Sequence, residues 1–269
     1  MCTPHTLSMV SLVCSMWMML RPQLDDRQWG KIEPLLILER GRGGRPPKDN
    51  RNFIEAVLWW RRTGVPWRDL PDAFGPWKTV FNRLDRWSKA GKWIALFEAL
   101  QRDRDDEWHS IDSTINRAHQ HSAGGKGGCA QHGIGRSRGG LSTKVHMIVD
   151  ALGLPLTFEL TEGQRHDNQP AQELVVRAKS SCLLGDKAYD SDAFRAALDK
   201  QGCVAVIPSN GSRAQKLPYD KERYKARSEI ECSFSLLKQA RRFATRYEKT
   251  LRNYSAVVAL GCALLWLRI

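Results

Sequence analysis

The sequence contains no Cys-x-x-Cys pair and no apolar run long enough to cross a membrane. Its seven cysteines are scattered and odd in number, which argues against a disulfide framework and favours reduced thiols in a cytoplasmic protein. Residues 9–20 and 256–267 are apolar, but each is only about a dozen residues long, whereas a spanning helix needs about 20. No basic residue precedes the first run and no A-x-A site follows it, so we do not expect a signal peptide. Met19 would serve as a start codon, and residues 1–20 are interpreted as a non-native or disordered extension.

Acidic residues are fewer than basic residues in this sequence. The chain has 29 Asp and Glu against 42 Lys and Arg, a net charge of +13 over 269 residues. This excess indicates a polyanionic partner, most simply nucleic acid, although an ordinary basic surface is the alternative. With 42% hydrophobic residues, the chain can bury the core of one large or two modest domains. We find no internal repeat.

The first hundred residues show helical periodicity on both sides of a Gly/Pro/Arg loop at residues 41–51. The expected elements are a helix over 25–36, a helix over 50–64 that runs from an Asn cap to Gly64, and, within 67–93, a short helix, a Gly-Pro turn and a longer helix. The last helix carries Lys78, Arg83 and Arg86 away from its apolar face. A helix, a turn and a basic helix predict a helix-turn-helix-like DNA-binding domain over residues 21–104. An ordinary three-helix bundle is the alternative.

After a charged joint at residues 101–107, the hydrophobic period changes. The expected elements are a strand at 108–115, two strands within 141–163, a helix at 167–179, a strand at 182–190, a helix at 191–202, a strand at 203–209 and helices to the end. This order predicts an α/β domain over residues 105–269, a mixed sheet flanked by helices.

A glycine-rich basic segment, residues 123–140, interrupts this pattern. Its glycines argue against any regular element. We interpret it as a mobile loop that becomes ordered on a phosphate backbone through Arg136 and Arg138, with a passive linker as the alternative.

Two aspartates stand in otherwise apolar strands. Asp112 lies midway through the first strand, and Asp186 ends the run LLGD. A charged group there is costly unless it is paired or bound to a cation, and sites in open α/β sheets gather where strands end. Together with a glutamate from a helix, they would form the all-oxygen ligand set that Mg²⁺ and Mn²⁺ favour.

The stretch YKARSEIECSFSLLK, residues 224–238, offers two glutamates. At about 100° per residue, Glu231 shares a stripe at the edge of the core with Tyr224, Arg227 and Lys238, whereas Glu229 faces away. From helix geometry alone, a metal ligand and a surface ion pair between Arg227 and Glu231 are equally good interpretations.

The spacing Tyr-x2-Arg-x3-Glu-x6-Lys at these positions matches the signature of bacterial insertion-sequence DDE transposases. The blocks IDST, IGRSRGGLSTKVH, EGQRHDN and LLGDKAYDS resemble those of the insertion sequence five family, as do LDDRQW, GRPPKDNR, GVPWRDLP and WKTVFNRLDRW nearer the N-terminus. They occur in order with compatible gaps, over about residues 20–269.

The resemblance implies an RNase H-like catalytic core in which Asp112, Asp186 and Glu231 are the catalytic, metal-binding triad for Mg²⁺ or Mn²⁺. It also implies that Tyr224, Arg227 and Lys238 support the site or contact DNA; Lys144, in the STKVH block, is a further DNA-contact candidate. The implied partners are double-stranded DNA, as inverted-repeat ends and target, and further copies of the chain in a dimer or higher oligomer at the bacterial nucleoid. Metal-activated water would cleave the strand, so no Ser or Tyr nucleophile is required.

Other polar side chains are weaker candidates. His119, His121, Cys129 and His132 could in principle bind zinc, but their spacing is irregular. His166 and Asp167 follow a strand and border the expected site, and helix capping is the expected role for Asp167. His109 and His146 alternate with apolar residues and are expected to be structural.

Two other functions compete with an active transposase. One is a DNA-binding regulator with an inactive catalytic core, against which the intact triad argues. The other is a repair or RNA-directed nuclease of the same fold, which would not need paired DNA ends.

Overall fold

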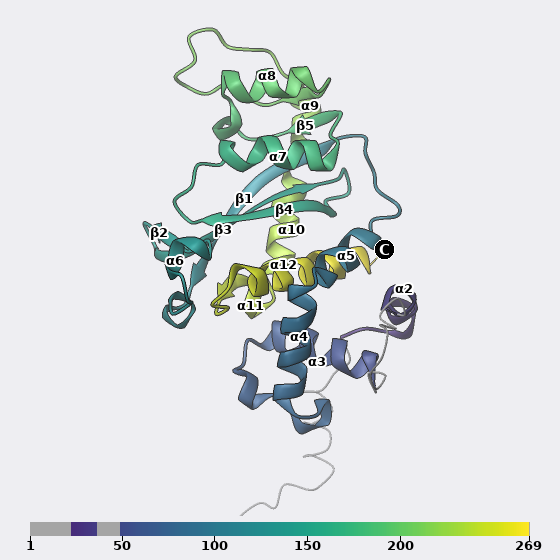
Figure 1. The fold of residues 1–269 in the computed structure, drawn as a ribbon. Helices are drawn as coiled ribbons and strands as arrows, with labels where there is room; N and C mark the ends of the chain where they lie inside the picture. The colour runs from purple at the N-terminus through teal and green to yellow at the C-terminus, as the bar shows by residue number, and fades with distance from the viewer. Residues whose placement is uncertain (1–22, 37–48, 269) are drawn as a thin grey trace, which may run out of the picture.

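The computed structural model describes residues 23–36 and 49–268 (Figure 1). The expected extension at residues 1–20 and most of the loop at 41–51 lie outside these ranges. The N-terminal part is helical. Its elements are α2 (Asp26–Leu36), α3 (Asn50–Thr63), the 3₁₀ turns η2 (Trp67–Asp69) and η3 (Asp72–Phe74), α4 (Trp77–Lys89) and α5 (Lys92–Ala99).

Helix α3 begins one residue earlier than an Asn50 cap would allow. Asp49 is the N-cap, and its carboxylate accepts a hydrogen bond from the Asn52 N–H at 2.8 Å, which satisfies one of the free donors of the first turn. The expected glycine end is confirmed. Gly64 has a φ of 77° and its N–H donates to the Trp60 carbonyl, a left-handed stop that glycine adopts without strain.

The expected short helix before the Gly-Pro turn is wrong. Two single 3₁₀ turns, η2 and η3, stand there, and Pro66, Pro71 and Pro76 each come immediately before an element. A proline supplies no backbone N–H and therefore starts a turn more readily than it continues one. Only the longer helix, α4, is confirmed.

The second part is an α/β unit built around a seven-stranded mixed sheet. Its strands are β1 (His109–Ala118), β2 (Gly135–Ser137), β3 (Gly140–Val149), β4 (Pro155–Glu162), β5 (Cys182–Leu184), β6 (Val204–Val206) and β7 (Thr245–Arg246). Its helices are α6 (Gly128–Gln131), α7 (Asn168–Ala178), α8 (Asp192–Lys200), α9 (Lys221–Tyr224), α10 (Ser228–Lys238), α11 (Arg241–Ala244) and α12 (Leu251–Trp266), with 3₁₀ turns η4 (Gln120–Ala123), η5 (Lys187–Tyr189) and η6 (Lys225–Arg227).

The main strands lie in the order β4, β3, β1, β5, β6. β3 is antiparallel to both of its long neighbours, whereas β5 and β6 run parallel to β1. This is the strand arrangement of an RNase H-like fold, so the expected fold class is confirmed. The parallel contact between β1 and β5 matters most for function, because it brings the carboxyl end of β5 beside the first half of β1.

Helices cover both faces of the sheet (Figure 1). α7 packs on β3 and β4, α10 crosses β1 and β3, and α12 packs on β4. Residues 256–267 are confirmed as a buried core segment within α12. No helix in the two described ranges is long and apolar enough to span a bilayer.

Two expectations for the α/β part need correction. The strand expected over 182–190 stops at Leu184, because the chain turns at Gly185 and Asp186 into η5. The segment 123–140 does contain regular structure, namely the one-turn α6 and the short β2, which pairs with β3. Some of its glycines occupy the turns around these elements, as at Gly127 with a φ of 96°.

The N-terminal helices are packed onto the α/β unit and share one continuous hydrophobic core with it. α5 and α4 contact α12, and α3 contacts α11. Two buried arginines reinforce this junction: Arg61 donates from Nε to the Val257 carbonyl at 3.1 Å, and the Arg242 guanidinium lies 4.3 Å from the centre of the Trp60 ring.

Candidate metal and DNA site

Asp112 lies in the middle of β1, where the strand is paired with β3. Its side chain is 25% exposed, so the carboxylate is accessible at the surface of an otherwise buried strand. The N–H of the next residue, Ser113, donates to Asp112 Oδ1 at 2.7 Å. This contact fixes one oxygen and leaves the other toward α10.

Asp186 lies beside Asp112 because β1 and β5 are parallel. The register pairs Ser110 with Leu184, and each aspartate follows its paired residue by two positions. Asp186 then begins η5, where its Oδ1 accepts from the Ala188 N–H at 2.9 Å. The two aspartates therefore lie on neighbouring parallel strands, Asp112 within β1 and Asp186 just after the end of β5.

Glu231 approaches from α10, and Arg227 joins it to Asp112. The Arg227 guanidinium lies 3.8 Å from Asp112 Oδ2 and forms an ion pair with Glu231 Oε1. The Arg227 side chain is 20% exposed, and that of Glu231 is 55% exposed. One cationic side chain thus stands between two of the three predicted acidic residues.

The helical phase used to separate the two glutamates needs one correction. The chain from Tyr224 to Lys238 is not one α-helix, because η6 interrupts it at Lys225–Arg227. Arg227 and Glu231 nevertheless lie together as an i,i+4 pair. Glu229 is exposed and lies beside the Gly153 turn between β3 and β4. Glu231 is more exposed than a position at the core edge would suggest.

The surroundings of Asp112 carry excess negative charge. Burial, together with the Asp186 and Glu231 carboxylates, raises the pKa of this carboxyl to about 6, against the opposing effects of the Ser113 N–H and Arg227. Burial and the two neighbouring carboxylates penalise the charged form. A site of this kind is stabilised by a cation, which Arg227 provides in part.

The three carboxylates suit Mg²⁺ or Mn²⁺ by chemistry and by charge, since these ions prefer oxygen ligands. Across residues 23–36 and 49–268, no three His, Cys, Asp or Glu side chains are arranged as a metal-ligand group. The three carboxylates therefore lie near one another but do not converge on a common point, because Glu231 is paired with Arg227. The zinc alternative gains no support: His132 Nε2 bonds the Lys126 carbonyl at 2.8 Å, and Cys129 Sγ bonds the Ala123 carbonyl.

Two of the predicted DNA-contact residues are engaged inside the protein. Lys144 is only 8% exposed, and its Nζ donates to the Arg165 carbonyl at 2.7 Å and to Asp167 at 3.1 Å. Arg83 lies over the Phe53 and Trp87 rings, 4.1 and 5.0 Å from their centres, and donates to Asn50. Lys144 is buried and is not placed to contact DNA, so that assignment needs correction, whereas Arg83 is half-buried and its contact with DNA stays a prediction.

The other predicted DNA-contact residues lie at the surface. Lys78 and Arg86 are exposed on α4, Arg136 and Arg138 are exposed at and beside β2, and Lys238 is exposed at the end of α10. Near the carboxylates, Arg227 lies over the Tyr224 ring, 5.8 Å from its centre. Tyr224 and Arg227 are the predicted contacts that the structure places beside the acidic residues.

Comparison with known proteins agrees with this arrangement. Residues 24–97 match the family described as "Putative transposase of IS4/5 family". Residues 105–266, more than half of the chain, match the family described as "Transposase DDE domain". The chain belongs to the DDE transposases of insertion sequences.

Curated relatives of this transposase family support the assignment. A "Putative transposase for insertion sequence element IS6501" from Brucella ovis is 40% identical over 130 residues, which are 48% of this chain and 100% of that protein. The "Uncharacterized protein y4sN" from Sinorhizobium fredii is 43% identical over 104 residues, 38% of this chain and 82% of that protein.

Solved transposase structures are more distant. The piggyBac transposase synaptic complex with hairpin DNA is 10% identical with a TM-score of 0.49, covering 94% of this chain and 72% of that one. A pre-cleavage Mos1 transpososome is 12% identical with a TM-score of 0.27, covering 85% of this chain and 81% of that one. The assignment to DDE transposases therefore rests on the sequence families.

Sequence reasoning assigned the wrong role to Asp167. The residue occupies the N-cap position of α7, but its side chain makes no capping hydrogen bond. Instead, its Oδ1 accepts from Ser113 Oγ at 2.7 Å and from Lys144, and it lies 3.5 Å from His146 Nδ1. The polar positions Lys144 and His146 on an otherwise buried strand are the signal that could have predicted a carboxylate partner there.

The remaining histidines behave mostly as expected. His146 is fully buried, with Nε2 2.8 Å from Thr161 Oγ1. His109 is also buried, between Ser180 Oγ at 2.7 Å and Asp106 Oδ1 at 2.8 Å. His166 is exposed beside Asp167.

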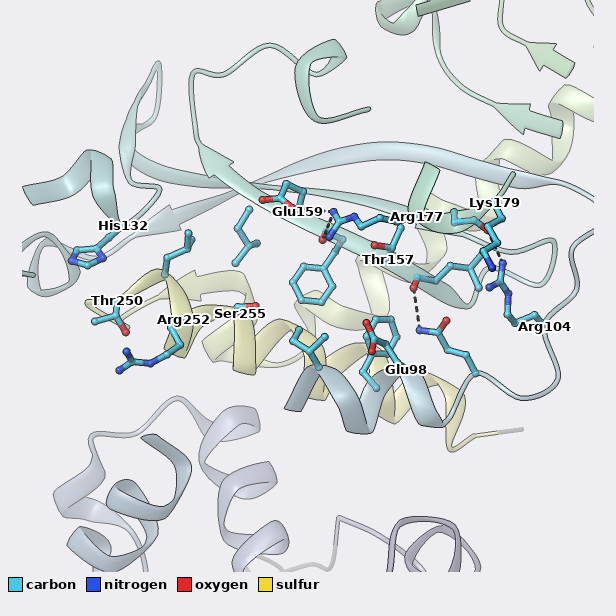
Figure 2. Close-up of a pocket in the computed structure, with 18 residues that line it drawn as sticks. Glu98, Arg104, His132, Thr157, Glu159, Arg177, Lys179, Thr250, Arg252 and Ser255 are labelled. Atoms are coloured by element: carbon cyan, nitrogen blue, oxygen red, sulfur yellow. Dashed lines mark hydrogen bonds and ion pairs between the residues drawn. The ribbon is translucent and has the colours of Figure 1, made fainter. Parts of the chain in front are cut away.

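A pocket of about 940 Å³ lies between α5, β4 and α12 (Figure 2). Arg177 spans one side of it, 2.9 Å from Glu159, and also donates to the Phe158 carbonyl on the free edge of β4. None of the three predicted catalytic carboxylates lines this pocket. It is therefore separate from the metal and DNA site.

Proposed function

We propose that the protein is an active transposase that cleaves DNA at the inverted-repeat ends of an insertion sequence and joins the ends to target DNA. The observation that carries this proposal is the proximity of Asp186 and Glu231 to Asp112, with Arg227 between Asp112 and Glu231, in a chain of the DDE family. The bound DNA and the site of action would be those of the bacterial nucleoid, in the cytoplasm.

Asp112, Asp186 and Glu231 would hold the divalent cations, Mg²⁺ or Mn²⁺. When bound, such ions activate a water molecule for phosphodiester hydrolysis and stabilise the departing 3′-oxygen. The chain itself supplies the fixed carboxylates on two neighbouring strands and the third on a helix. Because the metal would neutralise Glu231, Arg227 would become free to contact a DNA phosphate beside the cleaved bond.

Basic residues on the surface would hold the duplex. We assign the exposed side chains Lys78, Arg86, Arg136, Arg138 and Lys238 to phosphate contacts, with Tyr224 beside the site. Residues 21–104 would be the DNA-binding domain and residues 105–269 the catalytic domain. Since two DNA ends must be paired, the active form would be a homodimer or a higher oligomer.

The deciding experiment uses duplex DNA taken from both flanks of the coding frame. We expect Mg²⁺-dependent cleavage at imperfect inverted repeats and little cleavage of arbitrary duplex. Binding to the repeats without cleavage would instead indicate an inactive regulator, and equal cleavage of arbitrary duplex would indicate a general nuclease.

A further inference from the structure

A chain of two hydrogen bonds crosses strand β1 at the predicted catalytic residue. On one face, the Ser113 N–H donates to Asp112 Oδ1 at 2.7 Å. On the other face, the Ser113 hydroxyl donates to Asp167 Oδ1 at 2.7 Å. Neighbouring residues of a strand point to opposite faces, so Ser113 links a carboxylate beside α10 to one at the start of α7.

Asp167 is itself held by two elements. Lys144 on β3 donates to Asp167 Oδ1 at 3.1 Å and, at 2.7 Å, to the Arg165 carbonyl just before α7. The neighbouring His146 ring is uncharged at neutral pH, since burial lowers its pKa to about 4. Lys144, which is nearly buried, is therefore the positive charge that balances Asp167.

We propose that Asp167 is a positioning residue that orients Asp112 through Ser113. This inference rests on the proposed function. Partners behind a metal ligand fix its orientation, and their loss typically lowers metal affinity or activity by roughly 10–100-fold. Asp167, anchored by Lys144, holds the Ser113 side chain and adds to the β1–β3 pairing that fixes the backbone there, so that the Ser113 N–H keeps its contact with Asp112. The pairing also joins α7 to the two central strands at the point where the metal would bind.

The test compares four variants of the full-length chain: Asp167→Asn, Ser113→Ala, Ser113→Thr and, as a control, Ser88→Ala. Ser88 is a buried serine on α4, distant in sequence from Asp112 and Ser113. Its hydroxyl donates to the Leu84 carbonyl at 2.8 Å. Mn²⁺ binding is measured by electron paramagnetic resonance, together with thermal unfolding and cleavage of inverted-repeat DNA at increasing Mn²⁺.

We expect Asp167→Asn and Ser113→Ala to raise the Mn²⁺ dissociation constant by about tenfold or more, and to recover part of their cleavage at high Mn²⁺. Ser113→Thr keeps the hydroxyl and should bind Mn²⁺ like the wild type, as should Ser88→Ala. If Asp167→Asn fails to fold because it leaves the Lys144 charge unpaired, the comparison of Ser113→Ala with Ser113→Thr still tests the positioning role.

Two outcomes are distinguishable. Wild-type Mn²⁺ affinity in folded Asp167→Asn or Ser113→Ala overturns the positioning role while leaving the proposed function intact. A wild-type protein that neither binds Mn²⁺ nor cleaves the DNA overturns the proposed function, and the positioning role with it.

Discussion

Under the proposed function, Arg227 would compete with the metal for the acidic residues, and replacing it should reveal this competition. Its guanidinium is 3.8 Å from Asp112 Oδ2 and is paired with Glu231. In Arg227→Met, both carboxylates lose their cationic neighbour and repel one another more strongly. A divalent ion is then not repelled by the guanidinium and does not have to break the ion pair between Arg227 and Glu231, so it should bind more tightly.

The magnitude follows from Coulomb's law. Two unit charges 3.8 Å apart attract by about 1 kcal/mol at the dielectric constant of water and about 4 kcal/mol at a value of 20. Because the Arg227 and Asp112 side chains are 20% and 25% exposed, solvent screens this pair, and we take the lower figure as a minimum, about 1 kcal/mol, which corresponds to about a fivefold change in affinity.

The assay is a Mn²⁺ titration of the metal-free protein, with Arg227→Lys as the charge-retaining control. Arg227→Met should bind Mn²⁺ at least about fivefold more tightly and yet cleave DNA more slowly, since the proposed phosphate contact is lost. Unchanged or weaker Mn²⁺ binding by Arg227→Met would refute the competition.

Two further predictions concern stability. Glu248→Gln should lower the free energy of unfolding by about 3 kcal/mol or more, because it leaves the buried Arg242 charge without its carboxylate partner at 3.3 Å. Urea denaturation measures this free energy. As a control, Glu159→Gln at the exposed pair with Arg177 should change the free energy of unfolding by less than about 1 kcal/mol. The second prediction concerns Asp190: burial alone would raise its pKa, but hydrogen bonds from two arginines and the Asn210 N–H hold the pKa well below its ordinary value. The stabilisation is therefore complete above the unfolded pKa of about 4 and is lost as the pH falls below it. Thermal unfolding of Asp190→Asn should show a lower midpoint at neutral pH and a smaller loss toward acid; an identical acid profile would contradict this role.

Patterns within one element were predicted well. The two strands within residues 141–163, the apolar run in α12 and the glycine end of α3 depend on local sequence, and each was confirmed. The order of strands and helices predicted a mixed sheet flanked by helices, whereas the RNase H-like arrangement was implied by the resemblance to the transposase family.

Contacts between distant segments could not be predicted in the same way. Lys144 looked like a free basic residue because nothing nearby in the chain marks Asp167, 23 residues later, as its partner. Arg83 was assigned to a basic face, but Phe53 and Trp87 cover it. The ion pair between Arg227 and Glu231 is local, by contrast, and helix geometry predicted it as one of two interpretations.

The most direct test of the proposed function is Mg²⁺-dependent cleavage of inverted-repeat DNA by the triad variants. Asp112→Asn, Asp186→Asn and Glu231→Gln should each abolish cleavage while binding the DNA ends largely as the wild type does. Glu229→Gln, two residues from Glu231 and exposed, should cleave normally. Normal cleavage by any of the three triad variants would contradict the assignment of these carboxylates as the catalytic site.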